Sequence, residues 1–148
     1  MSHSPSAILI PSDLTGETRH LLDYALSQPH QAGARIILLH VVHIGEHVWS
    51  MLAKAYDTKG LEEQLRELAN GALAAYVADH PGDHPFKVEV QVHWGQPAEM
   101  VLSVADSEKV DEIVMGRHRP DSVKGFFLGS TADKVLRAAK VPVTVIPF

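Results

Sequence analysis

"EIVMGRHRPDSVKGFFLGSTADKVL", residues 112–136, passes from a short aliphatic run through a loop between Gly116 and Gly129 into a helical pattern. Its first four residues are typical of a strand that is covered on both faces of a sheet. Similar runs at 7–10 and 36–42 are each followed by an amphipathic helical pattern. Alternating strands and helices require a parallel sheet with right-handed crossovers, so these stretches predict an α/β fold.

The helices are predicted from apolar residues spaced by three or four positions. Pro97 fits the first turn of the third helix, where its missing N–H costs nothing, and Gly33 is placed where a left-handed residue can end the first helix. The predicted apolar stripes are Leu21, Leu22, Ala25 and Leu26 in the first helix, Leu61, Leu65, Leu68, Ala72 and Tyr76 in the second, and Ala98, Val101, Leu102 and Ala105 in the third.

The strand predicted at 86–93 alternates apolar and polar side chains, so one of its faces meets water and it belongs at a sheet edge. The order of elements is then β-α-β-α-β-α-β-α-β, and the last strand lies in PVTVIPF (142–148). A doubly wound, five-stranded parallel sheet of order 3-2-1-4-5, with helices on both faces, places 86–93 at one edge and the three apolar strands inside.

Length and composition fit one domain, residues 1–148, with 45% hydrophobic and 21% charged residues. The formal charge of -5 provides no cationic surface for nucleic acid. The absence of cysteine excludes disulfides, thiolate nucleophiles and cysteine-based zinc sites. The N-terminal apolar run is far shorter than a signal peptide or a membrane span, so a cytoplasmic location without membrane insertion is expected.

The chain winds in opposite directions from the first and the fourth strand, which opens a crevice at their carboxyl ends where ligands bind in such folds. The loop after the fourth strand ends at a helix start, whose free N–H groups and dipole favour an anion. The basic residues Arg117, Arg119 and Lys124 lie in that loop. The residues predicted to reach the crevice are Pro11, Ser12, Asp13, Val41 with Val42 beside it, Met115, Gly116, Gly129, Ser130 and Thr131.

Two interpretations of this loop remain open on the residues alone. In the first, the hydroxyls of Ser130 and Thr131 help to hold phosphates, and Asp13 accepts hydrogen bonds from an adenine amino group or a ribose. In the second, Ser130 or Thr131 merely caps the helix while the glycines permit turns. Neither a Walker loop nor a G-x-G-x-x-G pattern occurs in the chain.

Four short motifs, spread over essentially the whole chain, resemble the universal stress protein family. They are Ile10-Pro11-x-Asp13, Met115-Gly116-x-His118, Gly129-Ser130-x-Ala132 and Pro142-Val143-x-Val145. The resemblance implies a Rossmann-like α/β fold, whose nucleotide-binding branch holds ATP through the pattern G-x2-G-x9-G-[S/T]. It also implies dimers that pair through the last strand.

Carried over by position, the family pattern implies that Asp13 and Val41 contact adenine and ribose and that Gly116 contacts the ribose-phosphate. It implies that Gly129, Ser130 and Thr131 hold the phosphates of ATP, with ADP, AMP and an accompanying Mg²⁺ left open. This chain departs from the pattern at Arg119, which stands in place of the middle glycine. A side chain there either blocks close backbone approach to the phosphates or supplies a cation instead.

The sequence gives weak grounds for catalysis, because a Walker lysine is missing and Asp13 and His118 are the candidate groups in the crevice. His118 is interpreted as a phosphate contact rather than a general base, so no catalytic residue is assigned. A metal site among His40, His43 and His47 is disfavoured, because strand alternation puts the first two on opposite faces.

Two segments are predicted to meet partners. The last strand, 142–147, is apolar and uncharged at a sheet edge, so its copy across a two-fold axis would satisfy its backbone, unless a helix or loop of the monomer covers it. Residues 43–58 are predicted to be a long connection that either packs on the domain's own rim or recruits a protein.

These features lead to the hypothesis of an ATP-binding homodimer, with higher assembly left open, that acts as a nucleotide-dependent sensor or regulator of an unidentified protein in stress response. One alternative is a nucleotide-independent interaction module that recruits its partner through 43–58, with Arg119 abolishing nucleotide binding. The other is a very weak ATPase or autophosphorylating protein with Ser130 or Thr131 as acceptor.

Overall fold

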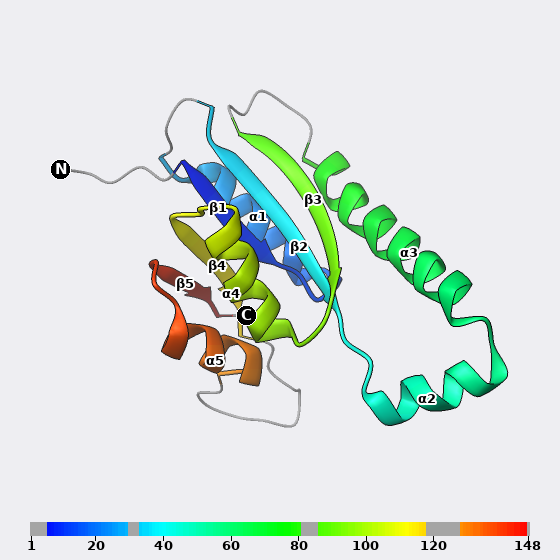
Figure 1. Ribbon diagram of the computed structural model, residues 1–148. Helices are drawn as coiled ribbons and strands as arrows, with labels where there is room; N and C mark the ends of the chain where they lie inside the picture. The colour runs from blue at the N-terminus through cyan, green and yellow to red at the C-terminus, as the bar shows by residue number, and fades with distance from the viewer. Residues whose placement is uncertain (1–5, 30–32, 81–85, 118–127, 148) are drawn as a thin grey trace.

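Five parallel strands form one sheet that carries helices on both faces (Figure 1). The computed structural model describes residues 6–29, 33–80, 86–117 and 128–147. The strand order β3-β2-β1-β4-β5 confirms the predicted doubly wound sheet and places β3 and β5 at its edges. The strands are β1 (Ala7–Pro11), β2 (Arg35–Val42), β3 (Lys87–Trp94), β4 (Glu112–Gly116) and β5 (Val143–Ile146). The helices are α1 (Glu17–Ser27), α2 (Glu46–Ala55), α3 (Thr58–Ala78), α4 (Pro97–Ser107) and α5 (Ser130–Ala138).

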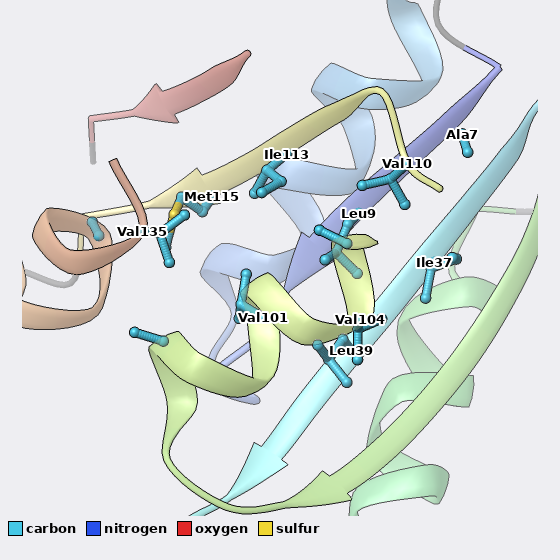
Figure 2. Close-up of a cluster of buried hydrophobic side chains, with 13 residues drawn as sticks. Ala7, Leu9, Ile37, Leu39, Val101, Val104, Val110, Ile113, Met115 and Val135 are labelled. Atoms are coloured by element: carbon cyan, nitrogen blue, oxygen red, sulfur yellow. The ribbon is translucent and has the colours of Figure 1, made fainter. Parts of the chain in front are cut away.

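Two apolar cores lie on opposite faces of the sheet, because successive strand residues point in opposite directions. In β1, Ala7 and Leu9 face α4 and α5, whereas Ile8 and Ile10 face α1 and α3. Figure 2 shows the first core, with Leu9 of β1 near Val101 of α4. Burial on both faces explains the unbroken apolar runs, since each fully buried aliphatic side chain contributes about 1.5–3 kcal/mol.

The β1–β4 pairing is short, and this positions the cleft. The ladder joins Ile8 to Glu112 and Leu9 to Ile113, and it stops before β1 ends at Pro11. On its other side, β1 stays paired with β2 along its whole length, as far as Pro11 and Leu39. The sheet therefore separates between the carboxyl ends of β1 and β4, which is the predicted switch point.

The buried stripe of α3 differs from the predicted one. Ala69 and Leu73 are its buried residues, whereas Leu68 is 71% exposed. Helix α3 already reaches β3 two residues earlier, where Arg66 Nη1 donates to the Val92 carbonyl at 2.9 Å, so Leu68 lies on the outer side of the helix. The other predicted residues, Leu61, Leu65, Ala72 and Tyr76, are half-buried, so the predicted stripe is wrong at Leu68, where the neighbouring Ala69 is buried instead.

Residues 43–58 contain a helix, α2, and not the irregular connection that was predicted. Gly45 precedes it as the N-cap residue, and Glu46 in its first turn and Lys54 in its last turn complement the helix dipole. Trp49 of this helix packs against Trp94, at the end of β3, with ring centroids 5.6 Å apart and the ring planes tilted by 60°. Helix α2 has no fully buried residue, so it lacks the buried apolar stripe from which the other helices were predicted.

The predicted start of α4 is confirmed, but the predicted end of α1 is wrong. Pro97 occupies the first turn of α4, and the side chain of Gln96 caps it by accepting from the Glu99 N–H at 2.8 Å. Helix α1 ends at Ser27 with Gln28 as its C-cap in an extended conformation. Gly33 does have the expected positive φ of 77°, but it lies two residues before β2 and so turns the chain into that strand.

Candidate functional site

A cleft of about 450 Å³ opens at the carboxyl ends of β1, β2 and β4 and reaches the start of α5. Its volume lies in the ordinary range for small-molecule sites, about 300–1,000 Å³. Its lining residues are Pro11, Ser12, Asp13, Glu17, Leu21, Leu39, His40, Val41, Pro97, Val101, Met115, Gly116, Arg117, Gly129, Ser130, Thr131 and Ala132.

Apart from Val42, the cleft brings together every predicted site residue that the structure describes. Those residues are Pro11, Ser12, Asp13, Val41, Met115, Gly116, Arg117, Gly129, Ser130 and Thr131. His118 and Arg119, which complete the predicted set, lie outside the described residues, and so does Lys124. Val42 does not line the cleft with its neighbour, because its side chain packs against the core on the α1 and α3 face.

One wall of the cleft is the turn between β1 and α1. The hydroxyls of Ser12 and Thr18, both buried, lie 2.7 Å apart, and the Leu14 N–H donates to Ser12 Oγ at 3.0 Å. Asp13 is exposed, and its Oδ1 accepts from both the N–H and the hydroxyl of Thr15, at 3.0 and 2.6 Å. Side chains of the turn thus bond to its own backbone, and they fix the place of Asp13 at the cleft.

The opposite wall is the first turn of α5. Its N-cap is Gly129, which has no side chain, and no side-chain hydrogen bond caps this helix within the described part of the chain. The first bond at this end runs from the Asp133 N–H to the Gly129 carbonyl, at 2.9 Å. The interpretation of Ser130 or Thr131 as the cap is therefore wrong, and the first turn of α5, at the positive end of the helix dipole, lines the cleft.

Arg117 adds a cationic group to this end of the cleft. Its Nε is buried and has no hydrogen-bond partner among the described residues. Leaving such a donor unpaired costs about 1–3 kcal/mol. Arg117 lies one residue beyond the end of β4 and lines the cleft, as the first turn of α5 does. An anion bound at the start of α5 would meet this guanidinium as well as backbone N–H groups.

Sequence reasoning missed several lining residues, and they fall into two kinds. Glu17, Leu21, Pro97, Val101 and Ala132 come from helices whose packing no motif specifies. Leu39 and His40 stand near the carboxyl end of β2, and the topology that led to Val41 could have found them. His40 is held by its Nδ1, which lies 2.8 Å from the Ser12 carbonyl oxygen.

The described residues contain no group of three or more His, Asp or Glu side chains placed to hold a metal ion. They also contain no helix of the length and apolarity that crossing a bilayer requires. Among the described residues, the polar groups that line the cleft are backbone N–H groups, hydroxyls, the Arg117 guanidinium, the His40 imidazole and the carboxylates of Asp13 and Glu17.

These observations define a doubly wound α/β fold whose cleft lies at the switch point and is bordered by the start of α5, which no described side chain caps. The universal stress protein family model matches residues 6–147, and the chain belongs to this family. Universal stress protein MJ0577 of Methanocaldococcus jannaschii is 29% identical to it, over 99% of this chain and 97% of that protein.

Solved structures of the same family share the fold. The structure of MJ0577 superposes with a TM-score of 0.79 at 26% identity, covering 97% of this chain and 96% of that one. A universal stress protein in complex with cAMP superposes with a TM-score of 0.59 at 18% identity, covering 98% of both chains. One from Archaeoglobus fulgidus in complex with dAMP also gives 0.59, at 19% identity and 99% coverage of both.

Proposed function

We propose that this protein binds ATP in the switch-point cleft and acts as a nucleotide-dependent sensor or regulator in stress response. The observation that carries the proposal is the composition of the cleft. Uncapped N–H groups of α5 and Arg117 form an end that suits phosphates, while Pro11, Val41 and Val101 form an apolar part that suits a base.

The proposed pose follows the division of the cleft. The phosphates lie against Gly129, Ser130 and Thr131, where backbone N–H groups and two hydroxyls donate to them. The nucleoside lies between the β1–α1 turn and the end of β2, with Asp13 and Val41 as its contacts. Gly116 lies between the two parts, beside the ribose-phosphate. His118 and Arg119 complete the proposed phosphate end.

The relatives support a purine nucleotide as the class of ligand. Two universal stress proteins with this fold have been solved with cAMP and with dAMP. Both ligands are adenine nucleotides with a single phosphate group. The length of the α5 end, with the four successive residues 129–132 lining the cleft, favours a longer phosphate chain for this protein.

Titration calorimetry with ATP, ADP, AMP and inorganic tripolyphosphate tests the proposal. We expect heat from ATP and a weaker response as phosphates are removed, because each phosphate lost removes contacts with the start of α5. Tripolyphosphate should bind more weakly than ATP but measurably. An absence of both heat and thermal shift with all four ligands rejects nucleotide binding.

We propose binding rather than fast turnover as the function of the site. The described carboxylates that line the cleft, Asp13 and Glu17, come from the β1–α1 turn and the first residue of α1. No described lysine lines the cleft. Phosphate release from ATP with Mg²⁺, compared with buffer, measures any slow hydrolysis. Transfer to Ser130 or Thr131 would appear as a mass increase of the intact protein.

We also propose that the protein is a homodimer through β5. The Ile113 N–H of β4 donates to the Pro142 carbonyl at 3.0 Å, so backbone alternation turns the N–H groups of Val143 and Val145 to the outer edge. A Val145→Pro variant removes one outward donor and leaves the β4 ladder intact. Sedimentation should show a dimer for the native chain and monomer for the variant. Equal masses would reject pairing through β5.

A second function is favoured by the surface of α2. Val48 is 51% exposed and Met51 60% exposed on this helix, which buries none of its residues fully. A partner polypeptide with a complementary apolar surface would cover them, which is the nucleotide-independent module of the sequence analysis. This function is favoured over the first if Val48→Lys abolishes capture of a partner from cell extract and the native chain binds no nucleotide.

A further inference from the structure

The β1–α1 turn is tied to a distant helix by one hydrogen bond. The hydroxyl of Tyr76, on α3, donates to the Leu14 carbonyl at 2.8 Å. The two residues are 62 positions apart in the chain, so the bond is a tertiary one. Tyr76 does not line the cleft, whereas the neighbours of Leu14, Ser12 and Asp13, do.

Leu14 has a conformation that leucine seldom adopts. Its φ is 65°, in the left-handed region, where a branched side chain costs about 1–2 kcal/mol. Such strain persists where surrounding contacts determine the backbone. Here the contacts come from both sides: Ser12 Oγ accepts from the Leu14 N–H at 3.0 Å, and Tyr76 binds the carbonyl.

The strained turn sets the position of Asp13. Because Leu14 reverses the chain locally, Thr15 comes back to donate two hydrogen bonds to Asp13 Oδ1. Relaxing Leu14 to a right-handed conformation would move both the Asp13 backbone and the Thr15 donors. The hydrogen bond from Tyr76 opposes this relaxation, since the Leu14 carbonyl would turn away from the hydroxyl.

Tyr76 is itself held in place by charged groups of α1 and α3. The Arg19 guanidinium lies over its ring, 5.9 Å from the centroid, and also pairs with Asp79 at 2.9 Å. One turn later, His80 lies against the Tyr76 carbonyl through Nδ1 and against Asp23 through Nε2. Helices α1 and α3 are therefore joined around Tyr76. These contacts hold the Tyr76 hydroxyl against the Leu14 carbonyl.

We propose that Tyr76 is a positioning residue for the nucleoside half of the site. It keeps Leu14 in its left-handed conformation and so holds Asp13 where the base and ribose bind. The inference rests on the proposed function, because it assigns a role in nucleotide binding to a residue outside the cleft. The phosphate end of the site, on α5, does not depend on Tyr76.

The test is a Tyr76→Phe variant titrated with ATP and with inorganic tripolyphosphate. Removing the hydroxyl should weaken ATP binding about fivefold, the fold-change that corresponds to one net hydrogen bond. Tripolyphosphate should bind as it does to the native chain, because it uses the phosphate end alone. Tyr56→Phe is the matched control, since Tyr56 is 67% exposed next to α2, and it should change neither affinity.

A second variant separates positioning from a general loss of packing. Glycine adopts positive φ without steric cost, so in a Leu14→Gly background the turn no longer needs Tyr76 to hold it. The effect of Tyr76→Phe on ATP affinity should then fall below about twofold, as a double-mutant cycle would show. An undiminished effect in that background overturns the inference.

The outcomes distinguish this inference from the function on which it depends. If the native chain binds neither ATP nor tripolyphosphate, the proposed function fails and the inference fails with it. If the native chain binds ATP and Tyr76→Phe binds it equally well, the inference alone is overturned. Equal losses of ATP and tripolyphosphate affinity would also overturn it, because they would show a general disturbance of the cleft.

Discussion

Arg35 Nη2, at the start of β2, lies 2.8 Å from the carboxylate of Glu108, the C-cap residue of α4. The same nitrogen lies 2.8 Å from Glu89 of the edge strand β3. The pKa values of the Glu89 and Glu108 carboxyls are lowered, chiefly by these hydrogen bonds, and the pKa of Arg35 is raised by the two carboxylates. The polar face of β3 is thus covered by an ion-pair network.

This network predicts a pH-dependent part of the folding stability. A carboxyl whose folded pKa is lowered contributes stability above its unfolded pKa, about 4.3 for glutamate, and loses it as pH falls through the folded pKa. At neutral pH, Arg35→Met should lower the free energy of unfolding by about 1 kcal/mol, since all three side chains are roughly one-third exposed.

Urea unfolding at pH 7 and at pH 3 measures this difference. The gap between the native chain and Arg35→Met should be largest at pH 7 and should shrink at pH 3, where the carboxyls become protonated. Arg137→Met, which breaks the exposed i,i+4 pair with Asp133, is the matched control and should change stability little at either pH. A gap that widens in acid contradicts the assignment.

Helix α4 ends in a Schellman motif with lysine at the position that usually carries glycine. The Val110 N–H donates to the Ala105 carbonyl at 3.0 Å and the Lys109 N–H to the Asp106 carbonyl at 3.2 Å. Lys109 has φ of 53° and is exposed. Lys109→Gly should therefore raise the free energy of unfolding by about 0.5–1 kcal/mol, because glycine adopts this conformation without strain.

Thermal unfolding of Lys109→Gly should show a midpoint a few degrees above that of the native chain. Gly33→Ala is the reverse experiment, since Gly33 has φ of 77° and open space around its Cβ position. That change should destabilise the protein by about 1 kcal/mol through backbone strain alone. Two outcomes would contradict the assignment of strain to these left-handed positions. One is that Gly33→Ala stabilises the protein, and the other is that Lys109→Gly does not.

The contact face of α3 can be tested by a pair of identical substitutions. Leu73 is fully buried in the core between α3 and the sheet, so Leu73→Ala should cost about 2–5 kcal/mol. Leu68, on the same helix, is 71% exposed, and Leu68→Ala should change stability by less than about 0.5 kcal/mol. Chemical denaturation measures both, and comparable costs would restore the sequence-predicted stripe.

The comparison of Leu68 with Leu73 shows what the sequence could and could not specify. The strands were readable because burial on both faces demands runs such as Ile36 to Leu39, and their order followed from topology and from the alternation in β3. Helix faces were less certain, because large exposed residues such as Leu68 obey the same spacing as buried ones. Nothing local in the sequence states which side of α3 faces the sheet at Leu68.

The cleft, too, could be predicted from the sequence only in part. Residues at strand ends, such as Asp13 and Gly116, were predictable, since topology alone brings the carboxyl ends of β1 and β4 together. Tyr76 was not, because its role depends on a hydrogen bond across 62 residues and on the conformation of Leu14. The helix α2 was missed because it buries no residue fully, although its charges and its glycine N-cap are signals of a helix.

The last prediction concerns the start of α5. Gly129 is buried with φ of -54° and ψ of 155°, a conformation that any residue adopts, so Gly129→Val introduces no backbone strain. It does place a branched side chain beside the N–H groups that the phosphates would approach. Affinity for both ATP and tripolyphosphate should fall at least about tenfold, because a side chain excludes the anion from its donors.

Gly45→Val is the matched control, since Gly45 is also a helix N-cap, with φ of -58° and ψ of 147° and open space around its Cβ position. It precedes α2 and does not line the cleft, so both affinities should stay unchanged. Calorimetry on the two variants, with circular dichroism to verify the fold, makes the comparison. Retained ATP affinity in folded Gly129→Val would place the phosphates elsewhere, since a buried valine at this N-cap leaves them no access to the first turn of α5.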